Sequence, residues 1–458
     1  MTPRPPEDHQ TLAHSLQPRH VTMISLGGII GAGIFVGSSA AINIAGPSVL
    51  FTYAMCGMLV FVIMRMLGEM AIARPGVGTF TGYIKLGLGP WAGFVCGWLY
   101  FYFWVVTIAV EAIAGAAILS DFMAVPPWIM STALIVLTTL LNLLSVRAYG
   151  EAEFWFAALK VLTITCFIAL GVAFIFGFGP GIGATVSTMK ASGGLFPAGG
   201  MALFTAIPVV IFSMMGSEVA TIAAVETENP AENVVRAART VALRILFFYL
   251  GSIAVIVAIV PWNEIVPGHS PFADAMMRVH IPGAGAFMSA VVFTAVASCL
   301  NSAIYVTSRM LHEMAERGDA PGLFTYVSMR RVPSLAIVIS SLAGFAMVLV
   351  SIASPERAFV FLLQSSGAII LCVYLLIAFS QIILRRRLDA AGESIPVKVW
   401  FFPYVSYALV AGILAVFALM ATKPDLREQV SLCALLFVSA VVAYQFKRRA
   451  AIPPAEVA

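Results

Sequence analysis

Residues 27–38 read GGIIGAGIFVGS, a glycine-rich stretch in a segment that is otherwise apolar enough to cross a membrane. Each glycine weakens a helix by roughly 0.5–1 kcal/mol relative to alanine. In hydrocarbon, backbone outside a helix is tolerated only where it lines a cavity or is buried in protein. The stretch therefore predicts a broken helix at a polar site inside a membrane protein. The alternative is that the glycines only allow close helix packing.

The composition of the chain is that of an integral membrane protein. Of its 458 residues, 60% are hydrophobic and only 10% are charged, whereas soluble domains carry about 25% charged residues. This leaves too little charge to cover a water-facing surface, so the chain is expected to fold mainly within lipid. The polar, proline-rich residues 1–19 lack the apolar core of a signal peptide, so a short cytosolic tail is expected there.

Apolar runs alternate with polar breaks along the whole chain. This pattern predicts an all-α polytopic membrane protein with about twelve transmembrane helices. The breaks include RPGVGTFTGYIK, ETENPAENVVRAART and LRRRLDAAGES. The expected spans are 20–45, 48–73, 91–120, 127–146, 154–177, 202–225, 238–260, 284–309, 335–353, 358–384, 403–421 and 428–446.

The basic residues indicate how the chain is oriented. If the N-terminus is cytosolic and the spans alternate, most of the 26 lysines and arginines fall on the cytosolic side. The prediction is a multi-pass protein of the cell (inner) membrane with both termini in the cytoplasm. The net charge of +4 follows from this topology and indicates no nucleic-acid partner. Arg65 and Glu69, at the inner end of the second span, are expected to form an intracellular gate or an anchoring ion pair.

A second interruption falls in the sixth span, where residues 211–226 read IFSMMGSEVATIAAVE. If spans one to five and six to ten are inverted repeats, spans one and six occupy corresponding places. Paired interruptions at such places are the best sequence indication of a transporter site. A broken helix exposes N–H groups that favour a carboxylate and carbonyls that favour an ammonium. Such a break can hold both ends of a zwitterion.

Several motifs resemble those of bacterial amino acid permeases of the amino acid–polyamine–organocation superfamily. They are GGIIGAGIFVGS, AGPSVL, IMRMLGEMA, YGEAEFWFAALKV and SRMLHEMAERGDAP, and the similarity runs from about residue 18 to about residue 450. Within the family, SCLNSAIYVTSRML, SSGAIILCVYLLIAFSQ and NLLSVRAYGEAEFW most resemble gamma-aminobutyrate (GABA) permeases. The resemblance implies proton-coupled amino acid uptake on a five-plus-five inverted-repeat core with two further helices.

This resemblance divides the chain into five parts. They are a cytosolic tail (1–19), a first repeat of five helices (20–177), a second repeat (202–384), two additional helices (403–446) and a second cytosolic tail (447–458).

The resemblance also assigns the substrate site to the two breaks. The substrate carboxylate is expected at the backbone of Ala32 and Gly33, flanked by Gly31 and Ile34. Many relatives have Ser or Thr in place of Ala32, so the backbone N–H groups are the expected anchors here. The amine is expected at carbonyls near Ile29, Phe212, Ser213 and Met215. Phe212 also occupies the position of an aromatic gate in some relatives, although ordinary packing is an equal alternative.

Lys160 is an ionisable residue inside a span, where charge costs roughly 2.5–3.5 kcal/mol or more. Burial destabilises its ammonium, so the residue is expected to take up and release a proton in each cycle. The resemblance places this amine where sodium-coupled relatives hold a sodium ion, so no sodium requirement is expected. Its candidate neighbours are the Gly28 carbonyl and Ser298, Asn301 or Ser302. The alternative is that Lys160 snorkels to the cytosolic surface.

Two acidic residues complete the predicted site. Glu111 lies near the middle of the third span, where it is expected either to meet the ammonium of an omega-amino acid or to be a buried structural hydrogen-bond partner. Glu218 follows the break in the sixth span, and relatives use an acid there in gating or proton linkage. Its alternative is to satisfy backbone groups freed by the break.

The favoured function is therefore proton symport of an amino acid, with GABA or a related omega-amino acid as the expected substrate. The alternative substrate is an aromatic, aliphatic or other alpha-amino acid.

A channel or receptor is less favoured because no filter repeats or charge rings are visible. The chain has no GxxxxGK[ST] motif and no metal-ligand spacing among its His and Cys residues, so neither ATP-driven transport nor a cofactor or metal is expected. No convergent catalytic set points to an enzyme. Nothing in the sequence indicates an oligomeric state.

Overall fold

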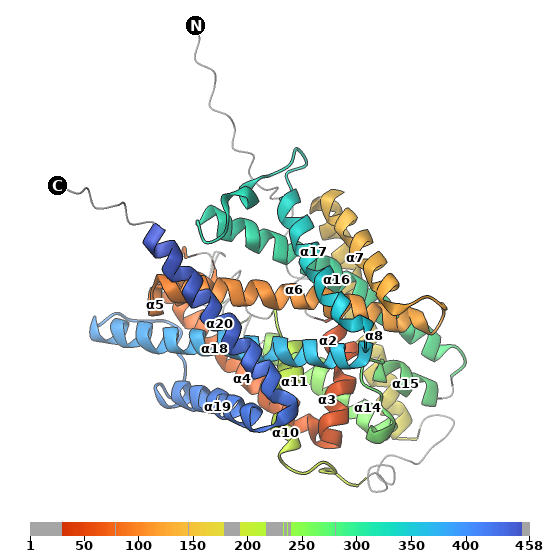
Figure 1. Ribbon diagram of the computed structural model, residues 1–458. Coiled ribbons are helices and arrows are strands. Elements are labelled where there is room, and N and C mark those ends of the chain that lie inside the picture. The colour runs from red at the N-terminus through yellow and green to blue at the C-terminus, as the bar shows by residue number, and fades with distance from the viewer. Residues whose placement is uncertain are drawn as a thin grey trace, which may run out of the picture.

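The computed structural model describes residues 30–77, 79–144, 146–177, 193–216, 232, 236, 240–279 and 281–450. These residues form a bundle of helices, and strands are absent from this part of the chain (Figure 1). Ten helices in it are long and apolar enough to cross a membrane. The all-α, polytopic fold class is thereby confirmed. The first of the ten runs from Ala32 to Ala73 and so includes both the first and the second expected span.

The first expected span is interrupted within this stretch. A short helix ends at Phe35, and Val36 (φ −125°, ψ −46°) separates it from the next helix. Val49 then begins a long helix that is continuous to Ala73. The elements are α2 (Ala32–Phe35), α3 (Gly37–Ala45), the 3-10 turn η1 (Gly46–Ser48) and α4 (Val49–Ala73).

A buried helix forms the centre of the bundle. This helix, α6 (Pro90–Ser120), presents buried side chains along most of its length. It follows a short helix, α5 (Phe80–Leu88), after a turn at Gly89 whose φ of 98° favours glycine. The next two helices are α7 (Pro127–Leu144) and α8 (Val146–Ile175).

The sixth expected span begins as two short helices, α10 (Ala202–Thr205) and α11 (Ile207–Ser213). After Ser213 the chain leaves the helix and reaches Gly216, whose φ is 93°. The break expected near Gly216 is therefore present on its N-terminal side, and residues 217–231 lie outside the described part. The elements that follow are the π-helical segment η2 (Ile245–Gly251), α14 (Ser252–Ile259), the 3-10 turn η3 (Trp262–Glu264) and α15 (Pro271–Arg278).

The second half of the chain contributes long helices. The elements are α16 (Ala284–Glu316), η4 (Gly322–Thr325), α17 (Ser334–Leu349), η5 (Val350–Ile352), α18 (Pro355–Ala390), α19 (Tyr404–Thr422) and α20 (Pro424–Ala450). Most ends lie within a few residues of the expected spans. The exceptions are the N-terminal end of α8, which begins eight residues before the expected span, and the C-terminal ends of α16 and α18. A helix that leaves hydrocarbon can continue into water on charged residues.

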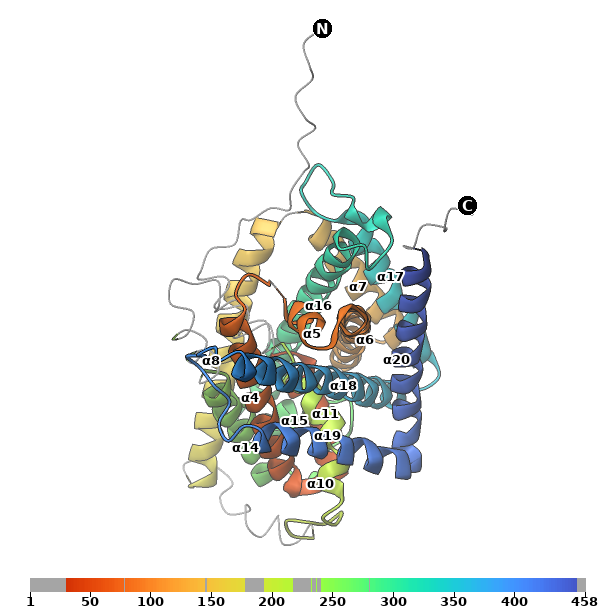
Figure 2. The ribbon, with the colours of Figure 1, turned by 90° about the vertical axis from the view of Figure 1, so that its left-hand side faces the viewer.

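Figure 2 looks along α6, which lies between α16 and α18 with α20 at its side. The short helix α11 packs against α18, and the two backbones lie very close together. A Cβ added at Gly367 of α18 would lie 1.8 Å from the carbonyl oxygen of Pro208 in α11. The interrupted helices are thus enclosed by long, continuous ones.

Basic residues gather where α4, α16, α18 and α20 finish, and we call this the basic end. Here the Arg74 guanidinium makes a two-pronged contact with Glu393, at 2.7 and 2.8 Å. Glu69 accepts hydrogen bonds from Arg385 (3.0 Å) and Gln381 (2.9 Å) of α18. Its partner is therefore on another helix. Arg65 instead donates to the carbonyl of Lys398 at 2.8 Å. The ion pair expected between Arg65 and Glu69 is therefore wrong in its partner, because Glu69 pairs with Arg385 and so joins α4 to α18.

Candidate functional site

The two interrupted helices meet in the buried interior. A Cβ added at Gly33 in α2 would lie 2.8 Å from the Cα and 3.0 Å from the Cβ of Ser213, the last residue of α11. Only glycine allows this approach. The structure therefore brings the expected break of the first span against the end of α11, close to Gly216.

The backbone at the start of α2 binds a carboxylate of the protein itself. The Ala32 N–H lies 3.0 Å from both carboxyl oxygens of Glu111. Ala32 begins the helix, so its N–H has no partner inside α2. Glu111 comes from α6 and is only 1% exposed. The amide that sequence analysis assigns to a substrate carboxylate is thus occupied by Glu111 in this conformation.

Cys299 of α16 completes this contact. A Cβ added at Gly31 would lie 2.5 Å from the Cys299 sulfur and 2.6 Å from a Glu111 oxygen. The Cys299 thiol and the Glu111 carboxylate are hydrogen-bonded to each other. Gly31 therefore makes room for both groups, and any larger residue there would displace one of them.

A second buried polar cluster surrounds Lys160 of α8. Its side chain is 1% exposed, and its ammonium nitrogen lies 3.8 Å from a carboxyl oxygen of Glu153, which is 0% exposed. The Ser298 hydroxyl of α16 donates to the Glu153 carboxylate at 2.7 and 2.8 Å. The snorkelling alternative for Lys160 is wrong, because the side chain is enclosed and pairs with a buried acid.

Phe212, Ser213 and Met215 lie at the end of α11, and each already has a contact. The Phe212 ring packs on Phe103 at 5.6 Å. The Tyr249 hydroxyl donates to the Ser213 carbonyl at 2.6 Å, and the Tyr374 hydroxyl donates to the Met215 sulfur at 3.2 Å. A carbonyl oxygen has two lone pairs, so Ser213 keeps a second acceptor site.

The remaining predicted residues are divided among three places. Asn301 faces α7, where its side-chain oxygen accepts a hydrogen bond from Asn142 at 2.8 Å. Ile34 is buried in α2 and Ser302 is buried in α16. Gly28, Ile29 and Glu218 lie outside the described residues.

Sequence analysis missed two residues of these clusters, Glu153 and Cys299. A signal for Glu153 was present, because residues seven apart in a helix lie two turns apart on one face, and Glu153 precedes Lys160 by that interval. A lysine buried in a span needs a counter-charge, which this spacing supplies. Cys299 gives no such signal, since buried cysteines commonly serve as small apolar residues.

The end of the bundle opposite the basic end is closed over the site. The Gly268 N–H donates to the Ser39 hydroxyl at 3.0 Å, which fastens the chain before α15 to α3. The Phe272 ring lies between Phe35 of α2 and Phe167 of α8, at 5.0 and 4.8 Å. Aromatic packing thus covers the interrupted helices from this side.

Comparisons with known proteins agree with this architecture. The family described as "Amino acid permease" matches residues 20–454. The chain is 44% identical to the gamma-aminobutyric acid permease of Bacillus subtilis (strain 168), over 96% of this chain and 94% of that protein. It is 42% identical to the gamma-aminobutyric acid permease of Escherichia coli (strain K12), over 94% and 93%. It is also 37% identical to the aromatic amino acid transport protein AroP of Corynebacterium glutamicum, over 94% of each chain. The long apolar helices and the near-complete match together show that this chain belongs to the amino acid permease family.

Proposed function

We propose that this permease is a secondary active transporter that takes up GABA, or a related omega-amino acid, together with protons across the cytoplasmic membrane. Two full-length relatives named as GABA permeases support the substrate. The observation that supports the proposed site most strongly is the hydrogen bond from the Ala32 N–H to the Glu111 carboxylate, because this buried amide already holds a carboxylate of the protein.

The proposed substrate exchanges places with Glu111. Its carboxylate takes the N–H groups of Ala32 and Gly33 at the start of α2, between Gly31 and Ile34. The released Glu111 then faces the substrate ammonium, together with backbone carbonyls of residues 29, 212, 213 and 215. The exchange keeps a carboxylate on the amide in both states, so neither state leaves a buried donor unsatisfied.

An omega-amino acid suits this exchange. Its ammonium lies several bonds farther from its carboxylate than that of an alpha-amino acid. A carboxylate on α6, a different helix from the one that holds the substrate carboxylate, can therefore reach the far end of the substrate. A zwitterion with adjacent charges would hold its ammonium close to the broken backbone instead.

Proton coupling is proposed for the cluster around Lys160. A proton on this amine replaces the metal cation of sodium-coupled relatives, and Glu153 provides the counter-charge at 3.8 Å. Ser298 holds Glu153 in place, and Ser302 lies one turn farther along the same helix. Glu218, Gly28 and Asn301 remain further candidates for coupling or gating from the sequence.

The proposed orientation places the basic end and both termini in the cytoplasm, as the positive-inside rule requires. In this orientation α15 and Phe272 close the external path to the site. Uptake then requires α15 to separate from α3, followed by opening at the basic end. The broken helices supply the rocking element in such transporters.

The test is uptake into proteoliposomes that contain the purified permease. An inward proton gradient should drive labelled GABA above its equilibrium concentration, and collapsing the gradient with a protonophore should release it. A competition panel of omega- and alpha-amino acids identifies the substrate class. Stronger competition by phenylalanine than by GABA would establish the aromatic alternative. Sodium-dependent accumulation without a proton gradient would contradict the coupling.

A further inference from the structure

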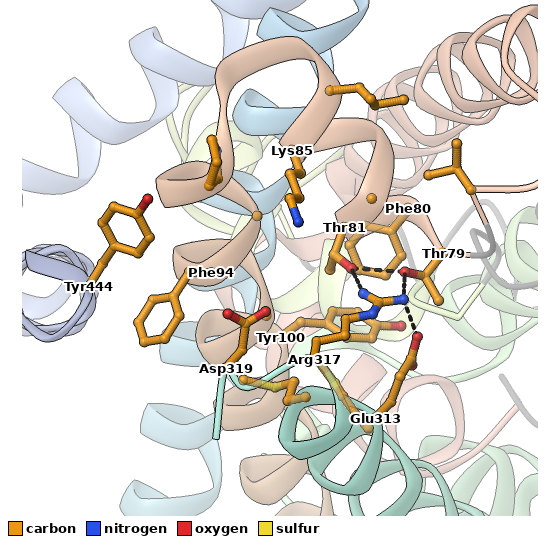
Figure 3. A pocket seen from close by; sticks show the side chains of 18 of the residues that line it. Thr79, Phe80, Thr81, Lys85, Phe94, Tyr100, Glu313, Arg317, Asp319 and Tyr444 are labelled. Carbon is orange, nitrogen blue, oxygen red and sulfur yellow. Dashed lines mark hydrogen bonds and ion pairs between the residues drawn. The ribbon is translucent and has the colours of Figure 1, made fainter. Parts of the chain in front are cut away.

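A cavity of about 1040 Å³ lies at the basic end, between α5, α6, α16 and α20 (Figure 3). Its volume is at the upper end of the range for small-molecule pockets, about 300–1,000 Å³. The residues that line it include none of the substrate-site residues Ala32, Glu111 and Lys160 among those the structure describes. The cavity is therefore distinct from the proposed substrate site.

An aromatic layer separates the two. Tyr100 lines the cavity, and its ring lies 6.0 Å from that of Phe103. Phe103 in turn packs on Phe212, at the end of α11. On the cavity side, Phe80 of α5 packs edge-on against Tyr100 at 4.7 Å.

The lining of the cavity combines apolar and charged side chains, which we call its wall and its rim. The wall includes Phe80, Phe94, Val306, Met310 and Met314. The rim carries more basic than acidic residues: Lys85, Arg309, Arg317, Lys447 and Arg448, with Glu313 and Asp319.

Both acids of the rim already have basic partners. Glu313 is paired with Arg317, whose guanidinium also donates to Thr79 (3.1 Å) and Thr81 (3.2 Å), as Figure 3 shows. Asp319 is paired with Lys447 of α20. The hydrogen bonds from Arg317 join the end of α16 to the start of α5, and the pair Asp319–Lys447 joins the chain after α16 to α20. Neither acid is therefore a partner of Lys85 or Arg448.

Lys85 and Arg448 supply the excess charge. Both side chains are exposed, and neither has an acidic partner among the residues that the structure describes. Figure 3 shows the Lys85 ammonium pointing into the cavity. A ligand that fits both parts of this space has an anionic group for the rim and an apolar body for the wall.

We propose that the cavity binds an anionic phospholipid, with its phosphate at Lys85 and Arg448 and an acyl chain against Phe94 and Met310. Under the proposed topology the basic end faces the cytoplasmic leaflet, and basic pockets between helices on that side bind anionic headgroups. The lipid touches α5, α16 and α20 at once. It therefore holds α20, a helix outside the proposed repeats, against the core.

The test uses the full-length permease without substrate, in nanodiscs of phosphatidylcholine or of phosphatidylcholine with phosphatidylglycerol of the same acyl chains. Phosphatidylglycerol should raise the midpoint of thermal unfolding of the wild type. Lys85→Gln/Arg448→Gln should lose at least half of this rise. Lys423→Gln, which removes an exposed lysine at the other end, should keep it. For each variant, the midpoint with phosphatidylglycerol is compared with the midpoint of the same variant without it. A change in the variant's own stability therefore does not affect the result.

Three results would overturn the proposal: no rise in the wild type, an equal rise in the double variant, or an equal loss in Lys423→Gln. A soluble anion is the other source of the same chemistry. If inorganic phosphate alone raises the midpoint in detergent and the double variant abolishes that effect, the site takes a free anion and the lipid assignment is wrong. These readouts need no transport, so they are independent of whether GABA is the substrate.

Discussion

At the scale of single residues, Glu111 is the most informative position. Its carboxylate accepts a hydrogen bond from the Ala32 N–H, and the proposed substrate displaces it. Glu111→Gln should weaken GABA binding roughly 10- to 100-fold, because a hydrogen bond to a charged group contributes about 1.5–3 kcal/mol. The measurement is competition against labelled GABA in proteoliposomes.

A carboxylate that lacks an amine, such as butyrate, tests whether Glu111 exchanges with the substrate or has only a structural role. In Glu111→Ala the amide loses its resident carboxylate, so butyrate should inhibit GABA uptake more strongly than in the wild type. Glu356→Gln, which neutralises an exposed acid of α18, should change neither property. Unchanged GABA affinity in Glu111→Gln, with unchanged butyrate inhibition in Glu111→Ala, would make Glu111 a structural residue.

The glycines of the first break provide a second residue-scale prediction. Gly33→Ala places a methyl group 2.8 Å from the Ser213 Cα, and overpacking of this kind costs about 1–3 kcal/mol. We expect a lower midpoint of thermal unfolding and a loss of most GABA uptake, because α2 and α11 must move apart. Gly37→Ala is the matched control, since its new methyl group would be no closer than 3.4 Å to a neighbour. Equal effects of the two substitutions would exclude a special role for the α2–α11 contact.

At the scale of helices, the pair Glu153–Lys160 joins α8 to α16 through Ser298. Removing one partner of a buried ion pair typically costs about 3–5 kcal/mol, because the other charge stays buried and unpaired. Glu153→Gln should therefore destabilise the permease more than the double variant Glu153→Gln/Lys160→Met does. Thermal unfolding in detergent measures both.

Transport measurements on the same variants distinguish a loss of proton coupling from a loss of stability. The double variant should bind GABA and exchange it across the membrane, yet fail to accumulate it when a proton gradient is imposed. Lys160→Ala alone should also lose accumulation. Proton-driven accumulation in the double variant would remove this pair from the coupling mechanism.

The helices also show how far sequence reasoning reaches. Apolar runs predicted the spans because a helix in lipid must be apolar for most of its length. They missed the last turns of α16 and α18, since charged residues outside the bilayer do not end a helix. Glycine clusters located the two breaks. They could not identify Glu111 as the partner of the Ala32 amide, because that contact depends on how α6 packs against α2.

At the scale of the whole molecule, the two ends of the bundle open in turn in the proposed transport cycle. Contacts that join separate helices at the basic end therefore stabilise one state of the cycle. The pair Arg74–Glu393 is one of them, because it ties the end of α4 to the chain that follows α18. Both residues lie in polar segments after their spans, where solvent pH reaches them directly.

This pair predicts a pH dependence of a definite sign. The hydrogen bonds from Arg74 hold the pKa of the Glu393 carboxyl below its usual range. A lowered folded-state pKa contributes stability that is present above the unfolded value, about 4.3, and is lost as the pH falls through the folded value. The wild type should therefore unfold at a higher temperature than Glu393→Gln at pH 7, and the difference should disappear in strong acid. In an Arg74→Gln background, proteins with Glu393 and with Glu393→Gln should unfold at the same temperature at every pH. The Glu393 carboxylate then has no guanidinium to pair with. A difference that persists in acid would show that Glu393 acts by packing instead of charge.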